Sequence, residues 1–271
     1  ADSNIGGTTA TKVYGTSVIE GTVGTVHANW TGKKENGSYI GYTTDKVALT
    51  LDGATTGNVY VGSDTEGYGA ELTVSGGSKV GGIYCRVYGS ANITGSDNVI
   101  NYINAKGSIT VEDAENTKIE AMVAEGATIN IIDSDIDIAI GTSNNIQLDE
   151  GTTMEISGST VDIQQLSIDA TSALKLTKTT FTVTGVYGSD LITNNGSITI
   201  DGFSTLTADS ITFGENATIT IDGTNFAGGG KKIIDLNGTE SLEGKVTVNG
   251  DGSGLVSNLS SDELDLAEQH E

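Results

Sequence analysis

Proline is absent from all 271 residues, although 38 of them are glycine. Collagen-like and polyproline helices depend on proline, and irregular loop-rich domains normally place it at turns, so this absence argues against those classes. Apolar residues make up only 36% of the chain, below the usual ~45–50%, because Gly, Thr, Ser and Asn replace them. Val, Ile and Thr are abundant, and their stiff branched side chains favour pleated strands. The composition therefore predicts an all-β protein.

Basic residues are scarce: 13 Lys and Arg stand against 36 Asp and Glu, and the net charge is −23. Arg86 is the only arginine. Binding to phosphate backbones needs many cationic side chains, so we expect no nucleic-acid partner, whereas an acidic surface attracts cations. No apolar run approaches the ~18 residues of a membrane span, so we expect no membrane insertion of this chain. Cys85 is the only cysteine; it cannot form an intrachain disulfide and is expected in the core.

One short unit recurs along the chain: a small residue, then apolar, polar and apolar residues, often followed by a turn residue. Its copies are 16 to 27 residues apart, with a mean of about 22. Such a period is typical of solenoids, whose units bury a common core only by stacking. The first inward residues of the ten units are Leu49, Leu72, Ile93, Ile109, Ile129, Met154, Leu174, Ile198, Ile219 and Val246.

These units predict a parallel β-helix of about ten coils, roughly 50 Å long at the usual spacing between strands. Right-handed coiling is expected, because long parallel connections favour it. An antiparallel β-sandwich is the alternative fold. Residues 1–46 repeat poorly and are expected to form an N-terminal cap or irregular first coils, and residues 47–250 form the repeats. Residues 251–271 are expected to be an acidic C-terminal tail or a short capping helix.

Three aspartates spaced two apart, Asp133, Asp135 and Asp137, resemble a cation site at first sight. The isoleucines before them occupy one phase of a strand, and those at 136–140 occupy the opposite phase. The chain must therefore bend between them, which places Asp133 and Asp135 at a corner and Asp137 on the outside of the next strand. Carboxylates at a corner can contribute to Ca²⁺ binding, so a calcium site at Asp133 and Asp135 is kept as a hypothesis, with no cofactor required.

The chain offers little for catalysis. Its two histidines, His27 and His270, both lie in terminal regions. Asp201, Asp222 and Asn249 occupy equivalent positions in successive units. Two carboxylates suffice for a glycosidase, but Asp-Gly and Asn-Gly are also favoured turn dipeptides. We therefore expect a ladder of turns and no enzyme, with a carbohydrate-active enzyme as the less favoured alternative.

Two kinds of binding surface are suggested by the outward residues. Trp30 and the N-terminal tyrosines are either stacking platforms for carbohydrate or side chains buried under a cap. A threonine column between the inward residues suggests an ice-binding face, but Asn130, Glu155 and Lys175 interrupt it.

The units GSITI (196–200), NATITIDG (216–223) and GKVTVNG (244–250) resemble the coils of bacterial secreted β-helix proteins, especially passenger regions of autotransporter adhesins. The resemblance implies a non-catalytic extracellular rod, secreted or at the cell surface, that acts as an adhesin or stalk. Its expected partner is a protein or glycan of a host or neighbouring cell. The alternative is a subunit that binds copies of itself and assembles into a surface filament or matrix. The resemblance concerns coils alone and transfers no functional residue.

Overall fold

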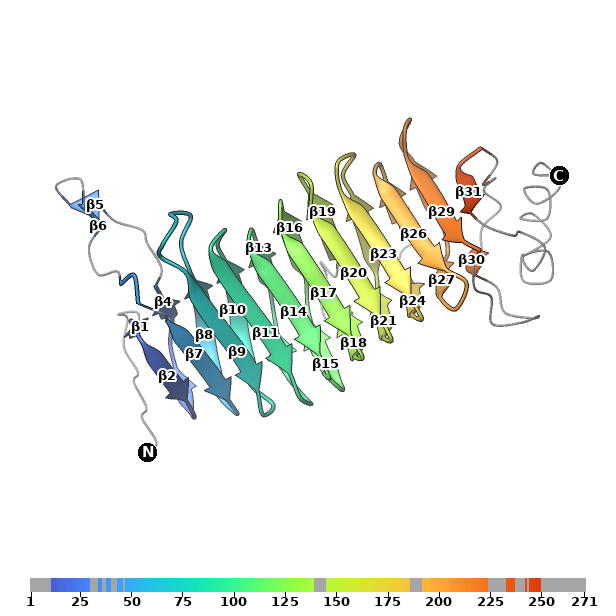
Figure 1. Cartoon of the computed structure of the whole chain (residues 1–271). Coiled ribbons are helices and arrows are strands. Elements are labelled where there is room, and N and C mark those ends of the chain that lie inside the picture. Colours follow the sequence, from blue (N-terminus) through green and yellow to red (C-terminus); the bar gives the residue numbers. More distant parts are fainter. Residues whose placement is uncertain are drawn as a thin grey trace.

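The chain is an all-β parallel β-solenoid, as seen in a computed structural model (Figure 1). The structure describes residues 11–29, 34–35, 38–39, 43–45, 47–138, 145–185, 192–223, 233–236, 242 and 244–249. These residues contain no helix. Trp30 and residues 251–271 lie outside them, and so do the predictions made for these segments.

One long sheet receives a single strand from each coil and is named the single-column sheet here. Its eleven strands are β2 (Thr16–Ile19), β7 (Ala48–Asp52), β9 (Ala70–Ser75), β11 (Gly89–Thr94), β14 (Ser108–Glu112), β17 (Thr128–Ile132), β20 (Thr153–Ser157), β23 (Ala173–Thr177), β26 (Ser197–Asp201), β29 (Thr218–Asp222) and β31 (Val246–Asn249). Each of the ten predicted units supplies one strand. The described residues add an eleventh, β2, so the predicted number of coils differs slightly from the structure.

The second long sheet contains two columns of strands, which the long strands β8 and β10 join, and is named the two-column sheet. Its strands are β1 (Thr11–Val13), β3 (Thr22–Val23), β4 (Val26–Ala28), β8 (Thr55–Val61), β10 (Lys79–Cys85), β12 (Val99–Ile100), β13 (Ile103–Ala105), β15 (Thr117–Ile119), β16 (Met122–Glu125), β18 (Asp135–Ile138), β19 (Asn145–Asp149), β21 (Thr160–Ile163), β22 (Gln165–Ile168), β24 (Thr180–Val183), β25 (Ile192–Asn194), β27 (Thr205–Ala208), β28 (Ile211–Phe213) and β30 (Ile234–Leu236). The short pair β5 (Lys34–Glu35) and β6 (Ser38–Tyr39) is antiparallel. All other pairings in the described residues are parallel, which excludes the antiparallel sandwich; right-handed coiling stays a prediction.

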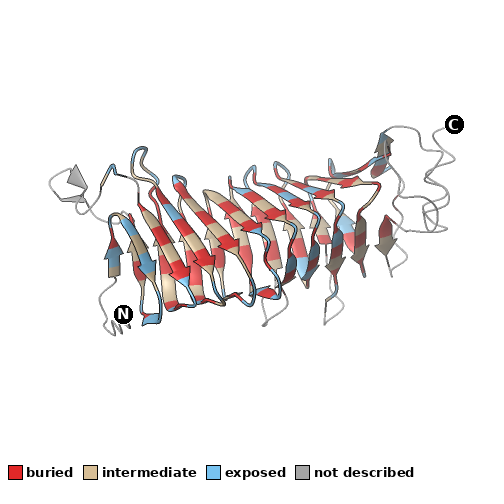
Figure 2. Ribbon diagram, turned by 60° about the horizontal axis from the view of Figure 1, so that its bottom comes forward, coloured by how far each residue is buried: buried red, intermediate tan, exposed pale blue. Residues whose placement is uncertain are grey.

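The core lies between the two long sheets, where like residues stack in register. Ile129 of β17 lies opposite Ile109 of β14 and Met154 of β20, and all three are buried. Alternate residues point outward, so buried and accessible positions alternate along the strands (Figure 2). Burial of each inward isoleucine or leucine contributes about 1.5–3 kcal/mol. Stacking therefore stabilises units that are individually too small to enclose a core.

The corner after the single-column strands has a shared backbone geometry. In seven coils the residue directly after the strand has a positive φ, and these residues are Gly53, Gly76, Gly95, Asp113, Asp133, Gly158 and Lys178. Glycine adopts this conformation without strain, and aspartate tolerates it better than most residues. The backbone bend therefore explains why glycine or aspartate follows the strand in most of these coils.

Polar side chains are buried just beyond this corner, where they bind the backbone of the neighbouring coil. Each side-chain oxygen accepts a hydrogen bond from the main-chain N–H one coil before it. The bonds are Ala54 N to Ser78 Oγ at 3.0 Å, Ser78 N to Asn98 Oδ1 at 3.1 Å, Ala114 N to Ser134 Oγ at 3.1 Å, Ser134 N to Ser159 Oγ at 3.1 Å, and Thr179 N to Ser204 Oγ at 3.0 Å. This corner ladder provides partners for amides that water does not reach.

Replacing Ser134 by alanine tests the corner ladder. The Ala114 N–H would lose its partner while it stays buried, so we expect Ser134→Ala to lower the free energy of unfolding by about 1–3 kcal/mol. Ser167 lies on the outer side of β22, and Ser167→Ala should change the free energy by less than about 0.5 kcal/mol. Urea denaturation of both variants measures the difference. Equal losses would contradict a special role of the corner.

Candidate functional site

Asp133 and Asp135 lie at the corner between β17 and β18, as the change of strand phase predicts. Asp133 follows β17 with a φ of 47°, and Asp135 begins β18, where it lies opposite Thr160. Asp137 is on the outer side of β18, beside Asp162 of the next coil. In the described part of the chain, no three Asp, Glu, His or Cys side chains form a group able to hold a metal ion. The calcium hypothesis at Asp133 and Asp135 stays a prediction.

The calcium hypothesis is tested by the double change Asp133→Asn and Asp135→Asn. Asparagine keeps an oxygen ligand and tolerates a positive φ, so the change mainly removes charge. If calcium binds at this corner, it should raise the melting temperature of the wild type and not of the double variant. Asp113→Asn is the matched control, because Asp113 occupies the same corner position one coil earlier with a φ of 51°. An equal response to calcium in wild type and double variant would reject the site.

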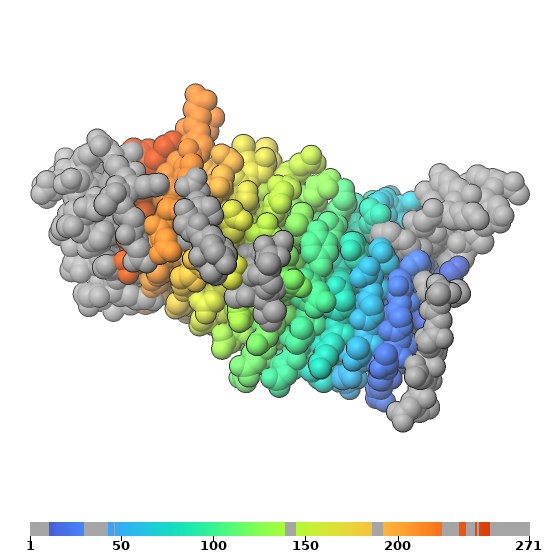
Figure 3. Space-filling view, turned by 180° about the vertical axis from the view of Figure 1, so that it is seen from behind, coloured from blue at the N-terminus to red at the C-terminus, as the bar shows by residue number. Residues whose placement is uncertain are grey.

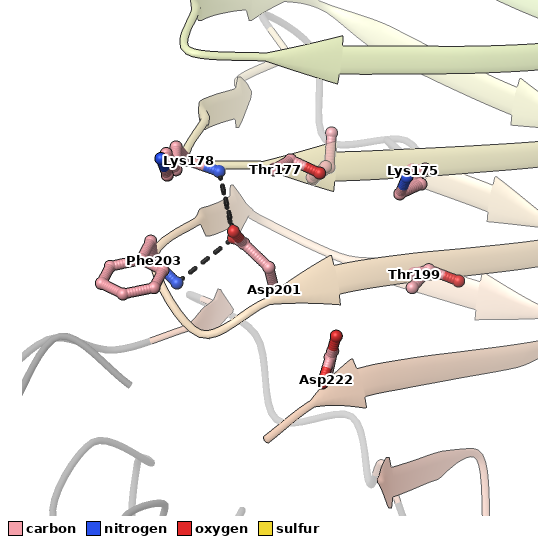
Figure 4. Close-up of a pocket in the computed structure, with 8 residues that line it drawn as sticks. Lys175, Thr177, Lys178, Thr199, Asp201, Phe203 and Asp222 are labelled. Carbon is pink, nitrogen blue, oxygen red and sulfur yellow. Dashed lines mark hydrogen bonds between the residues drawn. The ribbon is translucent and has the colours of Figure 1, made fainter. Parts of the chain in front are cut away.

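The carboxylate of Asp201 holds a turn (Figure 4). It accepts hydrogen bonds from the N–H of Lys178 at 3.1 Å, the N–H of Phe203 at 3.2 Å and the hydroxyl of Ser204 at 2.5 Å. Asp222 is its register neighbour in the next coil, and both line a pocket of about 350 Å³. Asp201 therefore receives hydrogen bonds from its own turn and from Lys178 in the preceding coil, which gives this carboxylate a structural role in the turn; the ladder through Asp222 and Asn249 stays a prediction.

The threonine column lies on the outer side of the single-column sheet in direct register. Its members are Thr50, Thr73, Asn92, Thr110, Asn130, Glu155, Lys175, Thr199, Thr220 and Thr247. Glu155 and Lys175 form an ion pair of 2.6 Å in its middle. Asn92 adds an interruption that the sequence repeat did not show. We therefore do not propose an ice-binding face.

The first coils of the two-column sheet present a different outer surface, named the aromatic face. It consists of the outward side chains of β1, β3, β4, β8, β10, β12 and β13 with their connecting residues: Lys12, Thr22, Thr25, His27, Thr55, Asn58, Tyr60, Lys79, Tyr84, Val99, Asn101, Tyr102 and Asn104. None of these side chains is a carboxylate, in a protein with 36 acidic residues.

The aromatic rings of this face form a row across successive coils. His27, Tyr60 and Tyr84 are in register, and Tyr102 lies beside them in the next coil. The rings of Tyr60 and Tyr84 stack at 4.8 Å with an interplanar angle of 18°. Tyr102 is 5.9 Å from Tyr84 and tilted by 54°, while His27 meets Tyr60 edge-on at 5.0 Å. All four residues are partly buried and keep part of their surface accessible to solvent.

A glycine allows this arrangement of rings. A Cβ at Gly82 would lie 3.1 Å from Asn58 Oδ1 and 3.2 Å from a ring carbon of Tyr84. The missing side chain at Gly82 thus leaves room for the ring of Tyr84, which packs along β10. At Gly81, a Cβ would lie 3.2–3.3 Å from the backbone of Gly57. Glycine therefore lets the backbones of successive coils approach closely beside the rings.

Charges on the aromatic face are positive and few. Lys12 and Lys79 are exposed and form no ion pair with another described residue. Burial, and secondly the charge of Lys12, lower the pKa of His27, which favours its uncharged form. Carboxylates border the face: Glu20 precedes β3, and Glu120 and Asp137 lie in the following coils. The outward side chains of the face itself carry two positive charges and no carboxylate.

The tyrosine row also affects ionisation. Burial, followed by the proximity of Tyr60 and Tyr102, raises the pKa of Tyr84. Behind the row, Cys85 is buried as expected, and burial raises the pKa of its thiol to about 12. A protonated, enclosed thiol is a poor nucleophile, so Cys85 serves packing.

A spectroscopic titration tests the geometry of the row. We expect Tyr84 to ionise above the ordinary pH range of tyrosine, because its phenolate would form in a partly desolvated site beside two other phenols. Tyr84→Phe should remove this late step and keep the ring stack. Tyr88→Phe, which changes a tyrosine with 42% of its surface exposed, is the control and should leave the late step in place. A late step that persists in Tyr84→Phe would contradict the row.

No protein-family model, curated protein or solved structure matches this chain. Within the described ranges, no helix has the length and hydropathy needed to cross a lipid bilayer.

Repeat analysis alone did not find the aromatic face. The signal lay in the second strand of each coil, where VHA (26–28), VYV (59–61), IYC (83–85) and INA (103–105) share an outward central residue. Only the pairing of these strands shows that the central residues are neighbours. Trp30, the predicted carbohydrate contact, lies outside the described residues.

Proposed function

We propose that this chain is a non-enzymatic extracellular β-solenoid that acts as a surface adhesin or stalk, with the aromatic face as its binding surface. One observation carries the proposal: a row of partly accessible aromatic rings lies on a described area whose outward side chains include two lysines and no carboxylate. Tyrosine is enriched at binding surfaces because its ring supplies contact area and its hydroxyl a hydrogen bond.

The scaffold suits this role. Both long sheets continue in parallel register along the described chain, and seen from behind, successive coils follow one another from the N-terminal to the C-terminal end (Figure 3). Outward side chains are therefore held on rigid strands, and little conformational entropy is lost when a ligand binds. The engagement of Asp201 in its turn supports a binding protein over a carbohydrate-active enzyme.

Self-assembly into a surface filament or matrix is the alternative. Tyr14 and Val18 of the first coil are 41% and 62% exposed, and exposed apolar side chains beside a terminal strand favour pairing between chains. Sedimentation velocity over a range of protein concentrations separates the two functions. Growth into fibres would favour the alternative over a monomeric stalk.

Adhesion measurements with the full chain test the proposed function. Beads coated with wild-type protein should bind cells or glycan-coated surfaces that beads carrying Tyr60→Asn and Tyr84→Asn bind several-fold less. Asparagine is chosen because Asn104 occupies this column one coil later. The matched control is Thr193→Asn with Thr212→Asn, in the same column further along. Melting curves verify folding of each variant. Equal adhesion by wild type and the tyrosine variant would reject the aromatic face as the binding surface.

A further inference from the structure

We infer that the ligand of the aromatic face is an anionic glycan, a polymer of sugars that carry carboxylates. This inference rests on the proposed function and names its ligand class. It depends on three properties of the face: its charge, its hydrogen-bonding groups and its shape.

The charge of the face favours an anion. Lys12 and Lys79 are its charged side chains, and they point outward without an ion pair to another described residue. At physiological ionic strength, screening limits the reach of exposed charges to about 8 Å. A ligand lying on the face therefore responds mainly to these two lysines and only weakly to the net charge of −23.

The polar groups of the face match sugar hydroxyls. Asn58, Asn101 and Asn104 each offer an amide that both donates and accepts. The tyrosine hydroxyls can do the same, and the tilted ring of Tyr102 offers an apolar surface for the C–H groups of a sugar ring. A purely apolar partner would leave these amides without hydrogen bonds, which is costly once water is displaced.

The shape of the face suits an extended chain. Gly57 packs closely against Gly24 in the preceding coil and Gly81 in the following one, and the ring row crosses these same coils. Single-stranded nucleic acid is also an extended polymer with rings that stack on aromatic side chains. Nucleic-acid binding depends on neutralising many phosphates with Lys and Arg, and the aromatic face supplies two lysines, whereas its amide side chains match the hydroxyls of sugar rings.

Binding to alginate tests the inference, with the same polymer after esterification of its carboxylates as the control ligand. We expect the chain to bind alginate, with affinity that falls as salt is added, and to bind the ester about fivefold more weakly. Lys12→Gln with Lys79→Gln should lose a similar factor, because two exposed charge contacts together contribute about 1 kcal/mol, which corresponds to about fivefold. Lys175→Gln, on the single-column sheet, is the matched control and should bind like the wild type.

The possible outcomes separate the inference from the proposed function. Equal binding of alginate and its ester, or no effect of the two lysine changes, would overturn the anionic ligand and leave an adhesin for neutral glycans. Stronger binding to single-stranded DNA than to alginate would overturn the glycan. If alginate is not bound, the inference fails, and the adhesion of the tyrosine variants then decides the proposed function by itself.

Discussion

Hydrogen bonding between successive coils is the constraint on which the rest of the structure depends. Inside the solenoid, strand amides donate to the adjacent coil, and at the corners this continues through main-chain bonds such as Asp133 N to Ser157 O at 2.9 Å and Gly158 N to Thr177 O at 3.0 Å. Where no carbonyl is in reach, a buried hydroxyl such as that of Ser134 accepts the bond. A proline would remove a donor from these ladders. The absence of proline, the first feature of the sequence, thus follows from a fold in which even the corners bond between coils.

The sequence predicted the inside of the molecule well because inward positions obey one rule in every coil. The positions of Ile129 and Ile131, the bend at Asp133 and the turn at Asp201 all follow from local pattern, since strand alternation and turn chemistry act over a few residues. The outside was harder to predict. Tyr60, Tyr84 and Tyr102 are 24 and 18 residues apart, and they become neighbours only through the register between coils of unequal length. That register is set by corners and pairing partners, which the sequence shows one at a time.

The fold separates what stabilises the protein from what can bind. Asn130, Glu155 and Lys175 replace threonines on the outer side of β17, β20 and β23, while their inward neighbours remain apolar and buried. An outward substitution therefore leaves the core stack unchanged. By the same logic, tyrosines and asparagines can collect on the first coils of the two-column sheet at little cost in stability. A concentration of one residue type on outward positions is thus better evidence of function than the repeat itself.

The distribution of charge bears on why tyrosines and asparagines gather on the aromatic face. Acidic side chains over most of the surface keep like molecules apart and discourage non-specific contacts. Random placement of acidic residues at their average frequency would put one or two among the outward positions of the aromatic face, and the face has none, whereas two of the few lysines are there. Stability does not require this, because in later coils the same columns accept Asp137 and Asp162 beside one another. The absence of carboxylates from the aromatic face is what the approach of a negatively charged group requires, and it agrees in sign with the proposed anionic ligand.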